Sequence, residues 1–382
     1  MIGKTCYQGN LQKNFGGGEV YTRFFTETMV SLGWNIVLFV ARGATFWPAL
    51  GLSGISLREI RDEKELLAAL PAERSLIVTH TALGAEMAKS LARQHILTGF
   101  MHMPLYERNP PGFAYYTRLF AVSRHVLDSA CSRGLRNVHP VPLYAMADLA
   151  PRARSSGDGN AIVANSIYDW DKRKVRDRLM SWFAPLVEKF VHRPTFKRRP
   201  GLTLGIVSRL TPIKQFPCMF SIIAPVLSRY PQVNLEIFGS GGYASVRDLK
   251  QALAPAWSQV RFWGQQGDVG RIYESLDYVL TGLPEKEALG LNLLEAQSRG
   301  TPVLAVNAPP FTETVVDGSG GYFFEDPRRD AGLGFGQLLE RLCTGVLPRP
   351  DPRLDTEQLA RFSREAFRSR VKAALDAAMV EA

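Results

Sequence analysis

The chain has little cysteine, no long apolar run and no histidine in its second half. Its four cysteines, Cys6, Cys131, Cys218 and Cys343, are widely spaced and form no Cys-x-x-Cys pair, so neither a disulfide framework nor a zinc site is indicated. No apolar run approaches the roughly 20 residues of a membrane helix, and the first ten residues lack the apolar core of a signal peptide. These absences favour a cytoplasmic protein whose contact with any membrane is peripheral.

The 382 residues are too many for a single ordinary core, and the hydrophobic content of 46% supports globular folding throughout. Short apolar runs alternate with helical stretches, as in parallel sheets covered by helices, so the predicted fold class is α/β. Residues 193–201 combine prolines, a glycine and basic residues, and we predict that they form an exposed linker.

This linker divides the chain into one domain at residues 1–199 and a second at 200–355. Residues 356–382 form a closing segment, whose amphipathic pattern predicts one or two helices that pack back toward the first domain. The candidate strands are residues 35–41, 75–79, 96–101, 119–123 and 138–141 in the first half, and 202–208, 233–238, 260–263, 278–281 and 302–306 in the second.

Positive charge is concentrated in the first half of the chain. Residues 1–200 hold 27 Lys and Arg against 16 Asp and Glu, whereas residues 201–382 hold 19 against 20. We therefore expect the first half to face an anionic partner, such as a phosphorylated lipid or polysaccharide acceptor or an anionic membrane surface. Nucleic acid is not expected, because no recognised binding motif accompanies the charge.

The segment from Glu287 to Glu295, Glu-Ala-Leu-Gly-Leu-Asn-Leu-Leu-Glu, is the most informative about function. Gly290 followed by an apolar helical run is typical of a helix N-terminus whose unpaired amides point at an anion. Glu287 and Glu295 bracket that terminus. Because like charges repel, these carboxylates suit hydroxyl groups better than phosphate. A nucleotide-sugar offers both a diphosphate and hydroxyl groups.

Two further segments carry groups suited to phosphate. Arg209 and Lys214 follow the first strand of the second half, and ligands bind at the carboxyl ends of such strands. Their charges could neutralise a diphosphate leaving group, and a solvated loop with two surface charges is the alternative. Gly16 and Gly17 open a glycine-rich turn before a helical run at residues 20–32, which would let the backbone approach a phosphate or sugar; a flexible turn is the alternative.

Together these segments resemble retaining glycosyltransferases of the GT-B type in family 4, and the resemblance covers most of the chain. The specific matches are the double-glutamate motif at Glu287 and Glu295 and the basic pair at Arg209 and Lys214. Supporting matches are Gly16-Gly17 and residues 121–123, 235–241, 260–264, 300–304 and 361–363. The resemblance implies two Rossmann-like domains facing one another across a cleft, the first binding the acceptor and the second binding the nucleotide-sugar donor.

The resemblance also implies roles for individual residues. The donor diphosphate would be held by Arg209, Lys214, Gly16, Gly17 and the backbone amides of Leu289, Gly290 and Leu291. Glu295 would hold the ribose, and Glu287 would face the transferred sugar. His102, at the end of a strand in the first half, would be the active-site histidine, with His80 at a similar strand end as the alternative. The other four histidines, His95, His125, His139 and His192, have no motif around them and are expected to have structural or surface roles.

Several features depart from the family pattern or have two interpretations. Residues 307–318 lack the paired glycines that many family members carry, and Glu285 is a second carboxylate close to Glu287. Asp169 and Asp171 resemble a metal-binding Asp-x-Asp pair, but Asp171 fits the N-cap of a following helix, and no metal is expected. That helix, at residues 172–190, has a basic and aromatic face that could lie on an anionic membrane or pack on its own domain.

The sequence therefore predicts a metal-independent retaining glycosyltransferase. Its co-substrate would be a UDP- or GDP-sugar, and its acceptor a glycan or a lipid-linked hydroxyl compound in the assembly of bacterial surface polysaccharide or glycolipid. The predicted location is the cytoplasm, at the inner face of the membrane where the contact is peripheral. A sugar-nucleotide epimerase, a glycosyl phosphorylase and a catalytically silent nucleotide-binding protein are the alternatives.

Overall fold

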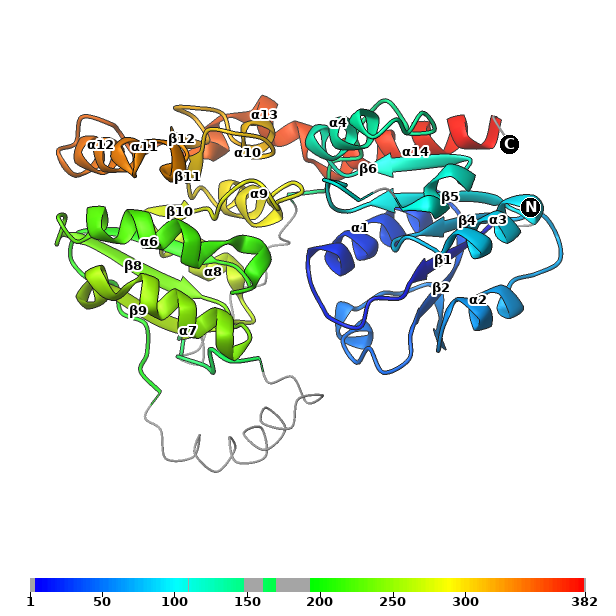
Figure 1. Ribbon diagram of the computed structural model, residues 1–382, viewed down its shortest axis with the longest axis horizontal. Helices are drawn as coiled ribbons and strands as arrows, with labels where there is room; N and C mark the ends of the chain where they lie inside the picture. The colour runs from blue at the N-terminus through cyan, green and yellow to red at the C-terminus, as the bar shows by residue number, and fades with distance from the viewer. Residues whose placement is uncertain (1–3, 109, 148–160, 170–192, 381–382) are drawn as a thin grey trace. The chain divides into compact units, whose positions relative to one another are not determined.

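The computed structural model describes residues 4–108, 110–147, 161–169 and 193–380 (Figure 1). The chain divides into two compact units. Unit 1 comprises Met1–Met146 and Ala360–Ala382, and unit 2 comprises Ala147–Leu359. Each unit is built around one six-stranded sheet.

Unit 1 contains a parallel sheet in the order β3-β2-β1-β4-β5-β6. Its strands are β1 (Thr5–Asn10), β2 (Asn35–Ala41), β3 (Ile55–Ile60), β4 (Leu76–Thr79), β5 (Ile96–Met101) and β6 (Arg118–Ala121). Strands β4 and β5 are buried along their whole length, as expected of strands covered by helices on both faces.

The α-helices of unit 1 are α1 (Gly17–Ser31), α2 (Glu63–Ala69), α3 (Ala85–Gln94), α4 (Arg124–Ser132) and α14 (Arg364–Val380). Tyr21, Phe25 and Met29 recur every four residues along α1 and are buried, so they form its apolar stripe. The C-terminal helix α14 contacts α1, and the ring of Phe367 meets that of Tyr21 edge to face at 5.7 Å. Segments at opposite ends of the chain thus share one core.

Unit 2 repeats the same strand arrangement. Its parallel sheet has the order β12-β11-β10-β7-β8-β9. The strands are β7 (Leu202–Val207), β8 (Val233–Phe238), β9 (Val260–Gly264), β10 (Tyr278–Leu280), β11 (Val303–Val306) and β12 (Gly321–Phe324). In the part of unit 2 that the structure describes, the α-helices are α6 (Phe216–Leu227), α7 (Tyr243–Ala252), α8 (Val269–Glu274), α9 (Leu291–Ser298), α10 (Phe311–Thr314), α11 (Pro327–Asp330) and α12 (Leu333–Cys343), and α13 (Thr356–Arg361) spans the boundary between the units.

In both sheets the strand order reverses beside the first strand. The reversal lies between β1 and β4 in unit 1 and between β7 and β10 in unit 2. In open α/β sheets the connecting segments diverge at this point, which leaves room for a ligand at the carboxyl ends of the strands. The topology therefore directs attention to the residues that follow β1, β4, β7 and β10.

The predicted fold class is confirmed, and nine of the ten predicted strands coincide with observed ones to within two residues at either end. The prediction of a strand at 138–141 is wrong, because Val138 makes only one isolated bridge, to Leu119. The sequence missed β1, β3 and β12. Helices α13 and α14 fall in the closing segment where one or two helices were predicted.

Along the sequence, the first boundary between the two compact units follows Met146, whereas the sequence predicts a boundary near Pro200. The predicted linker belongs to unit 2, because two of its residues pack there. The ring of Phe196 lies 5.2 Å from that of Trp263, and Arg199 forms an ion pair with the buried carboxylate of Glu236. The predictions for Asp171, for His192 and for the helix at 172–190 lie outside the described residues.

Candidate active site

The segment that follows β7 carries the two basic residues predicted to bind phosphate in unit 2. Arg209 lies two residues after the strand and is exposed, and Lys214 ends the short 3-10 helix η4 (Pro212–Lys214). The side-chain amide of Asn292 donates a hydrogen bond to the backbone oxygen of Val207 at 3.2 Å, which ties α9 to this strand end. The basic pair and the double-glutamate segment are therefore neighbours, although some 80 residues separate them in sequence.

Two glycines let the chain segments at this edge approach each other. A Cβ atom at Gly282, which follows β10, would lie 2.3 Å from the backbone oxygen of Lys214. A Cβ atom at Gly239, which follows β8 and has a φ of +148°, would lie 1.9 Å from the backbone oxygen of Ser208. Both distances are shorter than any normal contact, so these positions require glycine. The loop after β7 is held between them.

Glu287 and Lys214 form an ion pair at the centre of this arrangement. The ammonium of Lys214 donates to Oε2 of Glu287, and the backbone N–H of Ala288 donates to Oε1 at 3.2 Å. The backbone N–H of Glu287 itself closes a turn onto the carbonyl oxygen of Pro284 at 2.9 Å. Both side chains are partly buried, and the carboxylate has a fixed position in a turn.

The helix N-terminus predicted at Gly290 is present. Gly290 has a φ of +84° and a ψ of +57°, the left-handed conformation that glycine adopts most easily, and α9 starts at the next residue. The carbonyl oxygen of Gly290 accepts the first helical hydrogen bond, from Leu293 at 2.9 Å. Leu289 is buried. The amides of the first turn of α9 thus begin close in sequence to Glu287, which lies three residues before the N-cap Gly290.

Glu295 lies one turn further along α9. The phenol of Tyr273, on α8, donates to its Oε2 at 2.9 Å. Burial raises the pKa of the Glu295 carboxyl to about 7, and the Tyr273 hydrogen bond opposes this shift. Burial and the neighbouring Glu295 raise the pKa of the Tyr273 phenol well above its ordinary value. One carboxyl oxygen is therefore committed to Tyr273, and the other can accept hydrogen bonds from a ligand.

Glu285, the second carboxylate in the segment, has partners of its own. It accepts a hydrogen bond from Arg328 at 2.7 Å and one from Gln215 at 3.4 Å. The Arg328 contact lowers the pKa of Glu285. This pairing draws the Glu285 side chain toward α11, whereas Glu287 is drawn toward Lys214. The two carboxylates of this segment thus have different partners and point to different elements.

In unit 1, two histidines follow the adjacent strands β4 and β5, of which β4 borders the strand-order reversal. His80 comes directly after β4 and His102 directly after β5. Their rings are in contact, with Nδ1 of His80 3.3 Å from Nε2 of His102. Burial lowers the pKa of His102 to about 4. Burial and the neighbouring His102 lower the pKa of His80 well below its ordinary value. The structure therefore joins the two candidates for an active-site histidine into one pair.

Gly16 and Gly17 lie at the N-terminus of α1. Gly16 is buried and extended, with a φ of −171°, and its carbonyl oxygen accepts the first helical hydrogen bond, from Val20 at 3.2 Å. Sequence reasoning missed a polar group nearby. Asn10, at the end of β1, donates to Thr22 at 2.9 Å, and Gln8 accepts from Thr26 at 2.6 Å. The sequence feature that could have revealed this polar group is the pair of amide residues, Gln8 and Asn10, in one short strand.

Other features of the described residues bear less directly on the site. Asp169 donates its backbone N–H to Gly241 at 2.9 Å, and its predicted partner Asp171 lies outside the described part of the chain. Within residues 4–108, 110–147, 161–169 and 193–380, no group of three His, Cys, Asp or Glu side chains is placed to hold a metal ion. In the same ranges no helix is long and apolar enough to span a membrane.

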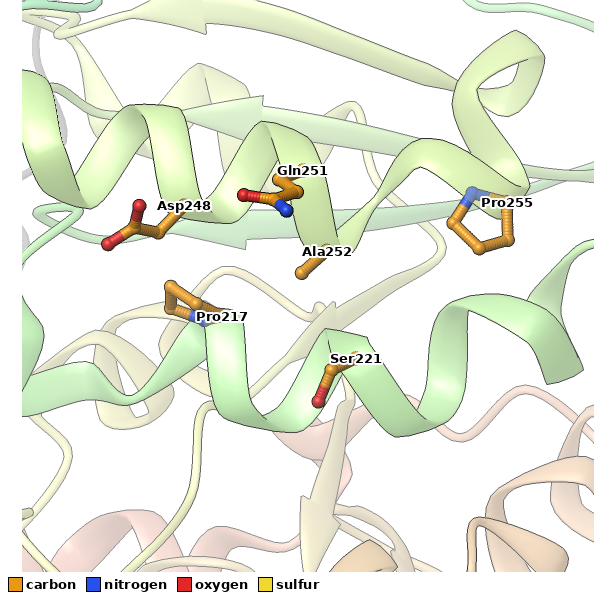
Figure 2. A pocket seen from close by; sticks show the side chains of 6 residues that line it. All are labelled: Pro217, Ser221, Asp248, Gln251, Ala252 and Pro255. Carbon is orange, nitrogen blue, oxygen red and sulfur yellow. The ribbon is translucent and has the colours of Figure 1, made fainter.

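A surface hollow of about 380 Å³ lies between α6 and α7. Figure 2 shows Pro217 and Ser221 of α6 facing Asp248, Gln251 and Ala252 of α7, with Pro255 at one end. None of the predicted site residues lines this hollow. It is a groove between two helices, and the strand ends that carry the site do not contribute to it.

Comparison with known proteins agrees with this picture. Residues 189–333 match the family described as Glycosyl transferases group 1. The phosphatidyl-myo-inositol mannosyltransferase of Mycobacterium tuberculosis is 30% identical over 127 residues, which are 32% of this chain and 33% of that protein. The D-inositol 3-phosphate glycosyltransferase of Corynebacterium urealyticum is 27% identical over 238 residues, 55% of each protein. The chain thus spans from a third to about half of the length of these curated relatives.

Solved structures are similar over nearly the whole chain. The crystal structure of Anabaena HepE in complex with UDP has a TM-score of 0.67 and 15% sequence identity, covering 98% of this chain and 100% of that one. Two parallel six-stranded sheets with flanking helices place the protein in the GT-B class of folds. Residues 189–333 are a glycosyl transferases group 1 domain, of the family numbered 4, which confirms the resemblance.

Proposed function

We propose that the protein is a retaining glycosyltransferase that moves a sugar from a UDP-sugar to a hydroxyl group of an acceptor. The observation that carries the proposal is the ion pair of Lys214 and Glu287 beside the N-terminus of α9. In this pair, a cation that can bind a diphosphate is hydrogen-bonded to a carboxylate that can face a sugar. UDP is the preferred nucleotide because HepE, which has the same fold, was solved in complex with UDP.

In the proposed donor complex, Arg209 and Lys214 neutralise the diphosphate, and the backbone amides of Leu289, Gly290 and Leu291, at the N-terminus of α9, donate to its oxygens. Glu295 accepts hydrogen bonds from the ribose through the oxygen that Tyr273 leaves available. In unit 1, Gly16 and Gly17 let the backbone approach the donor. The geometry within each unit and the family resemblance support these proposed roles.

Glu287 faces the transferred sugar in this proposal. As the bond to the diphosphate breaks, positive charge develops at the sugar carbon, and a fixed carboxylate stabilises it. The ammonium of Lys214 occupies one oxygen of Glu287 and the N–H of Ala288 contacts the other, which suits electrostatic stabilisation better than nucleophilic attack. The leaving diphosphate then accepts the proton of the acceptor hydroxyl on the same face of the sugar, so configuration is retained.

The acceptor in this proposal is a phosphorylated polyol, free or lipid-linked, of the kind used in bacterial surface glycolipid or polysaccharide assembly. The first 200 residues carry an excess of Lys and Arg that suits an anionic acceptor or an anionic membrane surface. The names of the two curated relatives refer to phosphatidyl-myo-inositol and to D-inositol 3-phosphate, both of which combine hydroxyl groups with phosphate.

The donor site is tested by thermal shift with UDP, GDP and ADP and without added metal. Ligand at 100 times its Kd stabilises the native state by about 2.7 kcal/mol, so a selective shift with UDP identifies the base. Lys214→Met and Arg209→Ala should reduce the shift, whereas Arg247→Ala, which removes an exposed charge from α7, should leave it unchanged. An equal shift in all four proteins would refute the assigned diphosphate ligands.

Transfer is tested with UDP-sugars and a panel of inositol phosphates and phosphatidylinositol vesicles. Glu287→Gln should still bind UDP, because the change releases Lys214 for the diphosphate, but it should lose transfer. Release of UDP that depends on an acceptor supports a transferase. Turnover that depends on inorganic phosphate, or isomerisation of the UDP-sugar alone, would contradict the proposal.

A further inference from the structure

In unit 1, the rings of His80 and His102 belong to one hydrogen-bonded pair. His80 Nδ1 and His102 Nε2 are 3.3 Å apart, and the ring planes are inclined by 23°. The backbone N–H of His80 donates to the carbonyl oxygen of Gly9 at 2.8 Å, which fixes the residue at the end of β4. The pair is therefore held by the sheet itself.

The surroundings of His80 are apolar. Its side chain is only 5% exposed, its ring stacks on that of Phe100 at 5.0 Å, and the ring of Phe25 meets it edge to face at 5.6 Å. The second ring nitrogen, Nε2, is buried and has no hydrogen-bond partner among the residues that the structure describes. Only one nitrogen of His80, Nδ1, thus has a partner.

The number of protons in the pair leaves two arrangements. Burial lowers the pKa of both rings, to about 4 for His102, so both are neutral near pH 7 and each carries one N–H. In the first arrangement His80 donates from Nδ1, and its buried Nε2 is an unpaired acceptor. In the second, His102 donates from Nε2, and the proton of His80 lies on the buried Nε2 as an unpaired donor.

The two arrangements differ in their cost. Buried N–H groups without a partner are rarer in proteins than buried acceptors without one. The rings of Phe25 and Phe100 offer at most a weak N–H···π contact in place of a hydrogen bond. The first arrangement is therefore the more stable.

We propose that His80 is a positioning residue that donates from Nδ1 to Nε2 of His102 and thereby fixes the His102 proton on Nδ1. This inference deepens the proposed function and rests on it for the claim that His102 meets the reacting sugars. His102 is partly buried. Among the residues that the structure describes, its Nδ1 has no hydrogen-bond partner and is not a fully buried polar atom, so this nitrogen is accessible to a ligand. His102 then presents an N–H donor there.

The consequence for the reaction is specific. A neutral His102 with its proton on Nδ1 donates a hydrogen bond to a sugar hydroxyl or to an oxygen that gains negative charge. It cannot take a proton at Nδ1, because that nitrogen has no lone pair available. The proton of the acceptor hydroxyl must therefore go elsewhere, in agreement with its transfer to the leaving diphosphate. His80 thus determines that His102 is a donor and excludes it as a general base.

The test is the tautomer of His102 in protein labelled with 15N at histidine, read from long-range 1H–15N correlations. Protonated and unprotonated ring nitrogens are well resolved in such spectra. Assignment uses His102→Gln and His80→Asn. We expect His102 to be protonated at Nδ1 and unprotonated at Nε2. A wild-type protein with His102 protonated at Nε2 would overturn the proposal, whether or not transfer activity is found.

Two variants of nearly equal shape test the role of the His80 N–H. In His80→Asn the amide nitrogen is bonded to Cγ, as Nδ1 of histidine is, and can donate to His102, whereas His80→Leu cannot donate. We expect the leucine variant to lose the unique His102 tautomer and to lower kcat about tenfold, the equivalent of one ordinary hydrogen bond. The asparagine variant should recover both, and KM for the donor should change little in either.

His95→Leu is the matched control for burial. His95 is 3% exposed, lies in unit 1 at the end of α3, and also has a buried ring nitrogen without a partner among the described residues. Its replacement should leave the His102 spectrum and kcat unchanged. Equal losses in both His80 variants with an unaltered His102 spectrum would show that His80 acts only through folding and would overturn the proposal. If the leucine variant does not fold, the wild-type spectrum still decides the tautomer.

Discussion

The raised pKa of Glu295 predicts an unusual dependence of stability on pH. An ordinary glutamate titrates near 4.5, whereas burial raises the pKa of Glu295 to about 7 in the folded protein. Between these values the folded state retains a proton that the unfolded state has released. The free energy of unfolding then falls as pH rises from about 4.5 to about 7, because the native state binds more protons. Replacement by glutamine removes this titration.

The magnitude follows from the two pKa values. A change from 4.5 to about 7, at about 1.4 kcal/mol per pH unit, corresponds to about 3 kcal/mol. Glutamine has the shape of the protonated acid and can still accept a hydrogen bond from Tyr273. Glu295→Gln should therefore be about as stable as wild type at pH 4 and about 3 kcal/mol more stable at pH 8. For a unit of this size that equals roughly 6–12 °C in Tm.

The assay is a series of thermal scans of both proteins from pH 4 to pH 8, in which the effects of other titrating groups cancel in the difference. Glu274→Gln, at an exposed carboxylate of α8, is the matched control and should change stability by less than about 0.5 kcal/mol throughout. A constant difference between Glu295→Gln and wild type across this range would refute the reasoning, because it would mean that the Glu295 carboxyl is not held in its protonated form by burial.

Three further predictions follow from contacts in the two units. In a denaturation experiment, Gly282→Ala should lower the free energy of unfolding by about 1–3 kcal/mol, because its Cβ would lie 2.3 Å from the backbone oxygen of Lys214. Gly267→Ala, whose Cβ would have no atom within 4 Å, should leave the free energy of unfolding unchanged. Arg199→Met should destabilise unit 2 by about 3–5 kcal/mol, because it leaves the fully buried Glu236 without its cation. The control Arg247→Met removes an exposed ion pair and should lower the free energy of unfolding by less than about 1 kcal/mol, and equal effects of the two changes would contradict the prediction. The exposed thiols of Cys131 and Cys218 should react first with a maleimide, as read by mass spectrometry, and rapid labelling of Cys6 in the folded protein would contradict the burial that raises the pKa of its thiol.

The strands that the sequence predicted are mostly apolar along their length. β8 and β5 are buried at every position, and their mostly apolar residues indicate them although Asn234 and Glu236 of β8 and Thr98 of β5 are polar. β1 was missed because Gln8 and Asn10 interrupt its pattern, and these side chains are tolerated only because Thr26 and Thr22 of α1 pair with them. β3 was missed because it is an edge strand with four consecutive exposed residues.

The boundary between the units was harder to predict. Residues 193–201 have the composition of a linker, but composition does not reveal that Phe196 and Arg199 have partners in unit 2. Trp263 and Glu236, the partners concerned, are 67 and 37 residues further along the chain. A local pattern cannot show such contacts, because it contains no information on which distant residues meet.

The sequence by itself determined the α/β class, the helix N-terminus at Gly290 and the spacing of Glu287 and Glu295, because these depend on neighbouring residues and on local backbone geometry. Only the tertiary structure decided that Lys214 pairs with Glu287, that Tyr273 occupies one oxygen of Glu295, and that His80 and His102 share a hydrogen bond. The reason is that parallel strands bring their carboxyl ends to one edge of a sheet whatever their order in the chain. Burial at that edge then shifts the pKa values of Glu295 and His102, and no sequence pattern predicts these shifts.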